Sequence, residues 1–285
     1  MSLGRWLVAA ALFIGVPGGA IAADLEPLPP AVPPVKAPTS YIPATPDWLV
    51  TIGAEVRAVP AWPGAPSTVY GIGGFPLFSL RKPGDPPFFF GARDGFGFPL
   101  IDLGAFQVGP VGTLNQPRYT APWGSLRGLA DVAWAVQVGA YAQYFPVPWL
   151  RIRAEVRQGV GGETGQSGDL YLDAIAPIGQ FRISGGPRLA VQSANAISPY
   201  FSVSAAQVAA SGLPAYNAGG GFYSYGAGSQ LEYFWNPQWQ THAIFEYERL
   251  TGSAANSPLV TVRGSANQFT FGLGATYSFS MHPLW

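Results

Sequence analysis

The chain has 285 residues, with 15 basic and 15 acidic side chains, no cysteine, 37 glycines and 29 prolines. Only 11% of the residues are charged although 48% are hydrophobic, whereas about a quarter of the residues in a soluble domain are charged. The even charge balance argues against a nucleic-acid-binding surface, and the lack of cysteine excludes disulfides and a lipoprotein acylation site. We expect a protein that turns one face toward a nonpolar solvent.

Residues 1–23 have the features of a secretory signal peptide, namely Arg5, the apolar run 7–16 and the small residues 20–22. A retained membrane anchor is the alternative. The run is short for that role, because a spanning helix needs about 20 apolar residues. A membrane protein without spanning helices has to cross the membrane as a closed β-barrel.

Residues 24–47 contain eight prolines, which cannot join a sheet ladder and favour extended polyproline II backbone. We expect a semi-rigid periplasmic arm. It is either an unstructured spacer after the signal peptide or a docking strip for a periplasmic partner that recognises proline-rich chain.

From Trp48 onward the pattern predicts strands. Runs at residues 50–57, 70–81, 88–98, 105–114 and 132–144 lead to the clearest amphipathic strand, residues 150–157. Apolar side chains occupy one face of that strand, and the other face carries Arg151, Arg153, Glu155 and Arg157. A charge facing lipid at the membrane midplane costs about 2–4 kcal/mol, so we expect this row to face a lumen.

Further runs cover residues 169–176, 181–192, 200–204, 223–235 and 239–249. The closing run 268–279 alternates aromatic or aliphatic residues with small polar ones, which predicts one lipid-facing side. The run 200–204 is the weakest, because the alanine-rich residues 205–210 favour a short helix. The predicted turns, 146–148, 177–180 and 236–238, do not all fall on one side of this twelve-strand assignment, so ten or fourteen strands are also compatible.

The sequence therefore predicts an all-β fold over residues 48–285, an antiparallel transmembrane β-barrel of about twelve strands closed by the C-terminal strand. A soluble β-sandwich is the alternative, but it would bury its aromatic residues inside. Here large aromatic residues gather near strand ends, as in an interfacial girdle: Trp134, Tyr144, Trp235, Trp239, Phe245 and Tyr247.

Residues 153–162, 204–217, 247–260 and 263–274 resemble, in this order, segments of the MipA/OmpV family (MltA-interacting protein). The resemblance implies an outer-membrane protein that bridges a lytic murein transglycosylase and a bifunctional murein synthase; relatives are described as antigens or adhesins. The chain departs from the family in lacking an acidic run at residues 193–198. It also continues past Phe279, so either Phe279 or Trp285 serves as the terminal aromatic.

The charged residues predict a paired polar network inside the barrel, because buried charges are retained mainly when paired. Its predicted members, with Asp173 as a further carboxylate, are Arg151, Arg153, Glu155, Arg157, Arg182, Arg188, Glu232, His242, Glu246 and Glu248. His242, Glu246 and Glu248 share one strand face, which also admits an acid–base or metal site. The only other histidine is His282, and the Gly-x-Ser-x-Gly pattern is absent, so we predict no enzyme and no cofactor.

Two functions follow from this pattern. The first is a structural scaffold in outer-membrane lipid and lipopolysaccharide, with the transglycosylase and the synthase as partners. The second is a small channel or a surface adhesin. They differ in whether Arg151, Arg153 and Arg157 cross the lumen to carboxylates or line an open path, because strand number alone does not decide.

Overall fold

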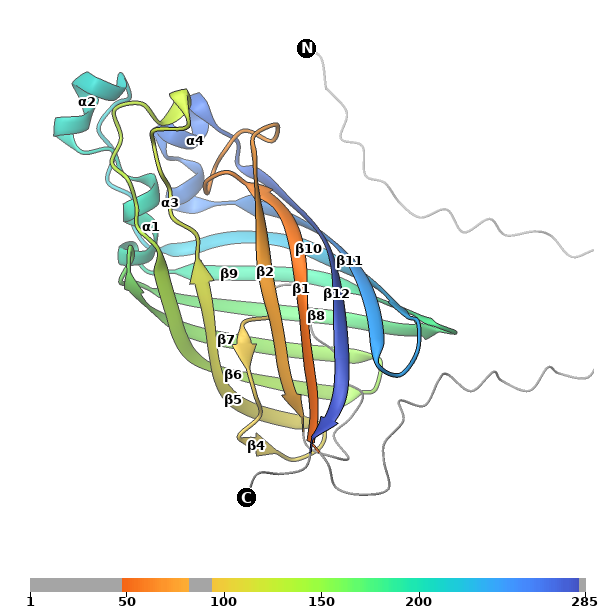
Figure 1. Ribbon diagram of the computed structural model, residues 1–285. Helices are drawn as coiled ribbons and strands as arrows, with labels where there is room; N and C mark the ends of the chain where they lie inside the picture. Colours follow the sequence, from red (N-terminus) through yellow and green to blue (C-terminus); the bar gives the residue numbers. More distant parts are fainter. Residues whose placement is uncertain (1–47, 82–93, 282–285) are drawn as a thin grey trace, which may run out of the picture. The chain divides into compact units, whose positions relative to one another are not determined.

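The computed structural model of the chain describes residues 48–81 and 94–281 (Figure 1). They all belong to one compact unit, Lys36–Trp285. The predicted signal peptide (residues 1–23), the proline-rich arm (24–47), the first part of the run 88–98 and Trp285 lie outside the described residues. Within these residues, no helix is both long and apolar enough to cross a membrane.

The described residues form one sheet of twelve strands, in which all neighbouring strands are antiparallel, with short helices between them. The strands are β1 (Trp48–Pro60), β2 (Tyr70–Arg81), β3 (Phe96–Gly97), β4 (Ile101–Asp102), β5 (Phe106–Asn115), β6 (Ala135–Val147), β7 (Leu150–Gly161), β8 (Gln166–Ile178), β9 (Phe181–Gln192), β10 (Gly221–Phe234), β11 (Trp239–Leu250) and β12 (Asn267–Met281). The helices are η1 (Gly124–Leu126), α1 (Ala194–Phe201), α2 (Ala205–Ser211), α3 (Gly252–Ala255) and α4 (Pro258–Arg263).

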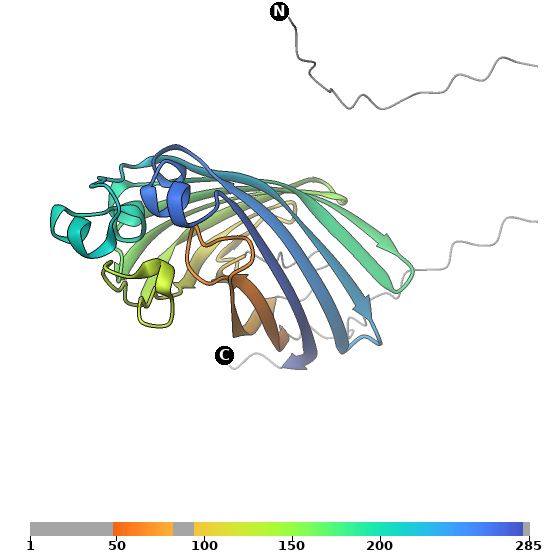
Figure 2. The same ribbon diagram turned by 90° about the horizontal axis from the view of Figure 1, so that it is seen from above.

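The sheet curls into a nearly closed barrel (Figure 2). Its strand order is β2-β1-β12-β11-β10-β9-β8-β7-β6-β5-β3, and β4 also pairs with β5. The first and last strands pair with each other, with Trp48 opposite Met281, so the C-terminal strand closes the described wall. The predicted all-β barrel of about twelve antiparallel strands is confirmed.

The closing strand β12 shows why the sequence folds in this way. Side chains on a strand point alternately to opposite faces, so a period-two pattern separates lipid from lumen. Phe271 and Leu273 face outward, and Leu273 is 69% exposed, whereas Gln268 and Thr276 face the lumen and are buried. The backbone meanwhile finds its hydrogen bonds in β1 and β11, as a wall in lipid requires.

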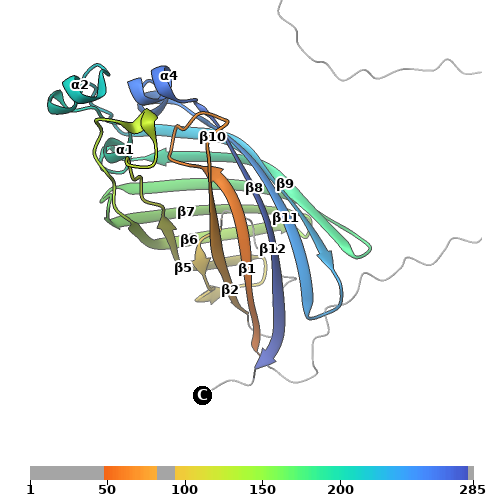
Figure 3. The same cartoon turned by 45° about the horizontal axis from the view of Figure 1, so that its top comes forward.

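The helical connections lie at one end of the barrel, and most of the short turns lie at the other. The end that holds Trp48 and Met281 carries the short turns at residues 148–149, 179–180 and 235–238. Gly179 adopts a positive φ of 61° in the second of them, which favours glycine. The helices lie in the connections at the other end (Figure 3). Outer-membrane barrels have short periplasmic turns and long extracellular loops, so the end that holds Trp48 and Met281 is the periplasmic end.

The predicted strand at residues 200–204 is wrong. Tyr200 and Phe201 end α1, where buried residues recur with helical spacing at Ala196, Ile197, Tyr200 and Phe201. The short helix expected after them is confirmed as α2, where the Ser204 backbone N–H donates to Gln207 Oε1 at 2.8 Å. Without the extra strand, all three predicted turns fall at one end.

The wall next to β5 is interrupted. β3 and β4 pair with the same strand in the same direction, with Phe96 opposite Gly112 and Ile101 opposite Val108. They therefore follow one path along β5 that is interrupted at Pro99, which has no backbone N–H to give to the ladder. Of the predicted run 88–98, the described residues contain only β3.

The apolar core lies at the extracellular end, where the loops pack into a cap. One cluster joins α1, α3, α4 and the top of the barrel: Val132, Ile197, Tyr200, Phe201, Ala218, Leu250, Ala254 and Val260. A second cluster lies beside it: Trp62, Ala65, Leu126 and Leu259. The helical loops are thus held by their own hydrophobic contacts.

A substitution on β12 tests the membrane-facing assignment. Leu273 lies near the middle of its strand, and we expect Leu273→Arg to lower the free energy of unfolding in lipid vesicles by about 2–4 kcal/mol, because a charge then faces hydrocarbon. Val262→Arg is the matched control, since Val262 is 67% exposed on α4 in the cap. Equal effects of the two substitutions on urea unfolding would contradict the assignment.

Candidate functional site

The charged row of β7 lies inside the barrel. Glu155 is 1% exposed, whereas its neighbour Val156 is 66% exposed on the outer face. Arg151, Arg153 and Arg157 share the inward face with Glu155 and are buried. The strand alternation thus brings four charges into the lumen from one strand.

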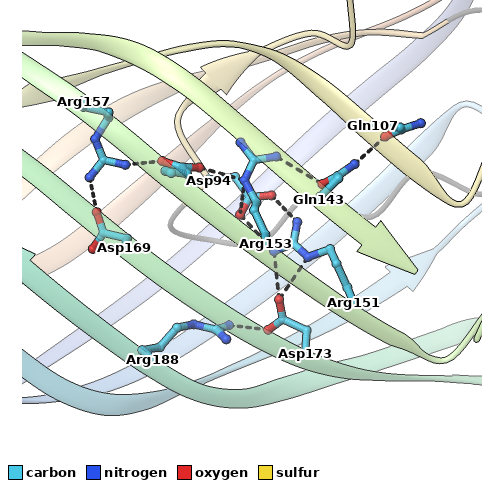
Figure 4. A network of polar contacts seen from close by, with 10 residues as sticks. Asp94, Gln107, Gln143, Arg151, Arg153, Arg157, Asp169, Asp173 and Arg188 are labelled. Atoms are coloured by element: carbon cyan, nitrogen blue, oxygen red, sulfur yellow. Dashed lines mark hydrogen bonds and ion pairs between the residues drawn. The ribbon is translucent and has the colours of Figure 1, made fainter. Parts of the chain in front are cut away.

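Arg151 is the centre of the first group of ion pairs (Figure 4). Its Nη1 and Nη2 donate to both carboxylate oxygens of Asp94, at 2.6 and 2.9 Å. Its Nη2 and Nε donate to Asp173 Oδ2 on β8, at 2.8 and 3.1 Å. Asp173 also accepts from Arg188 on β9. Arg151 is 1% exposed and Asp173 is 0% exposed, so this group is shielded from water.

Glu155 is the centre of a second group on the same strand. It accepts from Arg153 Nε at 2.7 Å and from Arg157 on its other side. Arg157 continues to Asp169 on β8 and, through Nε, to Gln137 Oε1 on β6 at 3.0 Å. The guanidinium of Arg153 also lies 3.9 Å from the ring centroid of Tyr141, a cation–π contact.

Two smaller groups lie farther around the wall. Arg182 on β9 pairs with Glu232 on β10, which also accepts from Gln240 on β11. His242 Nε2 lies 2.6 Å from Glu55 Oε2 on β1, and Glu55 also pairs with Arg57. Charged groups from both halves of the sequence therefore converge on one interior.

The structure brings most of the predicted residues together, but with partners that parity alone does not identify. The strand face of His242, Glu246 and Glu248 also admitted an acid–base pair; in the structure His242 contacts Glu55 on another strand. Four charged participants were missed in the sequence: Glu55, Arg57, Asp94 and Asp169. Glu55 and Arg57 were visible there as inward positions of the first alternating strand.

These ion pairs keep their charges out of contact with water. Burying two charges costs several kcal/mol per ion, and their attraction offsets that cost only when geometry is good and the remaining hydrogen bonds are made. Arg151 meets these conditions through two carboxylates. The inward charges are therefore paired with one another instead of being hydrated.

A cavity of about 330 Å³ lies between this network and the cap. Its lining includes Arg157 and Asp169 from the network, Glu246 and Glu248 from β11, and Phe201 from α1. Ser224 Oγ on β10 donates to Glu248. The last two predicted site residues thus line a polar chamber instead of joining the Arg151 group.

Two arginines fasten the cap through backbone carbonyls. Arg118 is buried and donates to the carbonyls of Tyr200, Pro199 and Ala130. Burial lowers the pKa of its guanidinium to about 10. Arg263 donates to the carbonyls of Ser125, Arg127 and Ser211. The loops at residues 116–134 and 193–220 are thereby tied to α1 and α4.

The arrangement favours structure over catalysis. The carboxylates of Asp94, Glu155, Asp169, Asp173 and Glu232 each accept from arginine. Across residues 48–81 and 94–281, no group of three or more histidine, aspartate or glutamate side chains gathers closely enough to hold a metal ion.

Several solved structures follow a similar path, although identity and TM-score are too low to bear on function. Outer-membrane expressed OmpT of Vibrio cholerae is 11% identical, with 82% of this chain and 98% of that chain covered and a TM-score of 0.36. The outer membrane protein OprG from Pseudomonas aeruginosa is 12% identical, with 83% and 97% covered and a TM-score of 0.28. The NanC porin is 8% identical, with 81% and 98% covered and a TM-score of 0.35.

The sequence itself gives the more decisive comparison. It has no significant match among proteins of curated function. Residues 52–279, however, match the family described as MltA-interacting protein MipA, over most of the chain and all but the ends of the barrel wall. The expected family resemblance is confirmed. The chain belongs to the MltA-interacting protein MipA family and is a β-barrel protein of the outer membrane.

Proposed function

We propose that this protein is a structural platform of the outer membrane that holds murein-remodelling enzymes at its periplasmic end. The expected partners are a lytic transglycosylase of the MltA type and a murein synthase. The buried Arg151–Asp173–Arg188 group supports this proposal, because charges that are paired across neighbouring strands strengthen the wall and do not line a wet path for solutes.

Two further features support the proposal. The family's own description is of a protein that interacts with MltA. The chain also enters β1 at Trp48, at the end that carries most of the short turns, which is the end where we expect the proline-rich sequence 24–47 to act. Trp149 and Trp235 are exposed at the same end and give a partner apolar surface.

Capture of partner enzymes tests this role. Tagged full-length protein in detergent should retain a purified MltA-type lytic transglycosylase, and deletion of residues 27–46 should weaken that retention about tenfold if the proline-rich residues dock the enzyme. The matched control leaves the periplasmic end intact. Val262→Ser alters an exposed side chain of the extracellular cap and should leave retention unchanged.

The outcomes separate the two parts of the proposal. Failure of the full-length protein to retain either enzyme would reject the platform role. Retention that is unaffected by the deletion would reject the docking strip and assign the contact to the periplasmic turns. Substitution of Trp149 and Trp235 by serine then provides the next measurement.

A further inference from the structure

One charged side chain breaks the pattern of the barrel wall. The charges described on β1, β7, β8, β9 and β10 face the lumen, as do Glu246 and Glu248 on β11. Arg249 directly follows Glu248 on the strand and therefore points to the opposite, outer face, together with Phe245 and Tyr247. Among the strand side chains that the structure describes, it is the one charge aimed at the membrane.

Arg249 lies at the extracellular rim, next to the last residue of β11. Across the two ladders it faces Tyr225 on β10 and Asn267 on β12. Its Nη1 donates to Asn267 Oδ1 at 2.7 Å, and the Tyr247 hydroxyl donates to the same oxygen at 2.8 Å. We call these four residues, Tyr225, Tyr247, Arg249 and Asn267, the rim patch.

The rim patch is rich in donors and lacks a counter-charge. Arg249 is exposed, and in residues 48–81 and 94–281 its side chain forms no ion pair; its one hydrogen bond there is to a neutral amide oxygen. A guanidinium has five N–H donors in a planar fork that matches the oxygens of phosphate. Most donors of Arg249 are thus available to a group outside the protein.

The depth of the rim patch indicates where that group comes from. The extracellular ends of the strands lie at the interface between hydrocarbon and headgroups, where an outward arginine costs about 0–1 kcal/mol and is tolerated. Aromatic side chains such as Tyr225 and Tyr247 prefer the same level. The headgroups of the outer leaflet, as in lipopolysaccharide, carry phosphate at this depth.

We propose that the rim patch binds a phosphate monoester, with Arg249 as the anion-binding residue and Tyr225 and Tyr247 beside it. The source is the phosphorylated glycolipid of the outer leaflet. The site is separate from the lumen and from the periplasmic end, so it does not depend on the platform role. It would fix the height and rotation of the barrel in the membrane at β10–β12.

Native mass spectrometry of the full-length protein in detergent tests the site with three probes: lipid A bearing its phosphates, dephosphorylated lipid A and inorganic phosphate. Wild-type protein should bind phosphorylated lipid A more tightly than the dephosphorylated form. In Arg249→Gln this preference should fall about fivefold to tenfold, the effect of losing charge-assisted hydrogen bonds worth about 1–1.4 kcal/mol. The control Arg127→Gln removes an exposed arginine from the cap and should keep the preference.

Each result either supports or contradicts the anion site. A preference that is equal in wild type and Arg249→Gln, or no preference at all, would overturn the site. Inorganic phosphate that binds with the same dependence on Arg249 would support the anion site and reject the lipid as its source. Arg249→Lys keeps the charge but loses the planar fork, and should retain part of the preference if Arg249→Gln fails to fold.

Discussion

Replacing Arg151 by alanine is expected to lower the free energy of unfolding by about 3–5 kcal/mol, the largest effect of any single substitution that we predict. The reason is that Asp94 and Asp173 would stay buried while losing a partner that satisfies both. Unfolding by urea in lipid vesicles, followed by tryptophan fluorescence, measures the loss. Heat-modifiability on gels shows whether the variant forms the barrel.

The matched control for this prediction is Arg127→Ala. Arg127 is exposed in the loop after η1, and its replacement should change the free energy of unfolding by no more than about 0.5 kcal/mol. Arg151→Ala combined with Asp94→Asn and Asp173→Asn should recover part of the loss, because the two uncompensated charges are then removed. A loss below about 1 kcal/mol in Arg151→Ala would contradict the buried network.

Wild-type protein is expected to give no large, steady conductance steps in planar bilayers, whereas Arg153→Ser combined with Glu155→Ser should give discrete steps. The pair is charge-balanced, and Arg157 keeps its contact with Asp169 when both are removed. Removing the two side chains empties space beside Tyr141, at the level of the ion pairs. Current through single inserted barrels is the measurement.

Val156→Ser serves as the control for conductance, because it alters the lipid-facing side of the same strand and should leave the protein silent. Large conductance steps from the wild-type protein would show that ions pass through the lumen, and would favour the channel over the platform. Silence of the double variant, with its folding verified by heat-modifiability, would place the barrier elsewhere, at the cap or in the chamber beneath it.

The sequence predicted those parts of the fold that depend on local alternation. The run 181–192 coincides with β9, and the closing run differs from β12 by one or two residues at each end. The cap was predicted only in part, because α1 is stabilised by tertiary contacts of Ile197, Tyr200 and Phe201 instead of by a local pattern. The short length of β3 is set by the position of Pro99. The alternation of apolar and polar residues does not show where a proline interrupts the hydrogen-bond ladder.

For the interior, parity predicted direction but not partners. Every residue expected inward on β7, β9 and β11 does face inward, since alternation is a property of a single strand. Pairing depends on register and curvature across strands. His242 contacts Glu55, which is 187 positions away in the chain. Arg151 on β7 contacts Asp94, which lies neither on β7 nor on the strands beside it. No spacing along the chain encodes such contacts.

The β1–β12 ladder also constrains how the protein is made. Its partners Trp48 and Met281 lie at opposite ends of the described chain, so the wall is complete only after the last strand has been exported. Until then β1 and each newly added strand present open edges, which readily pair with other chains. Pairing across such a long sequence separation is also slow. We therefore expect the exported chain to need a chaperone until β12 has paired with β1. A chain truncated before β12 should aggregate instead of inserting into the membrane.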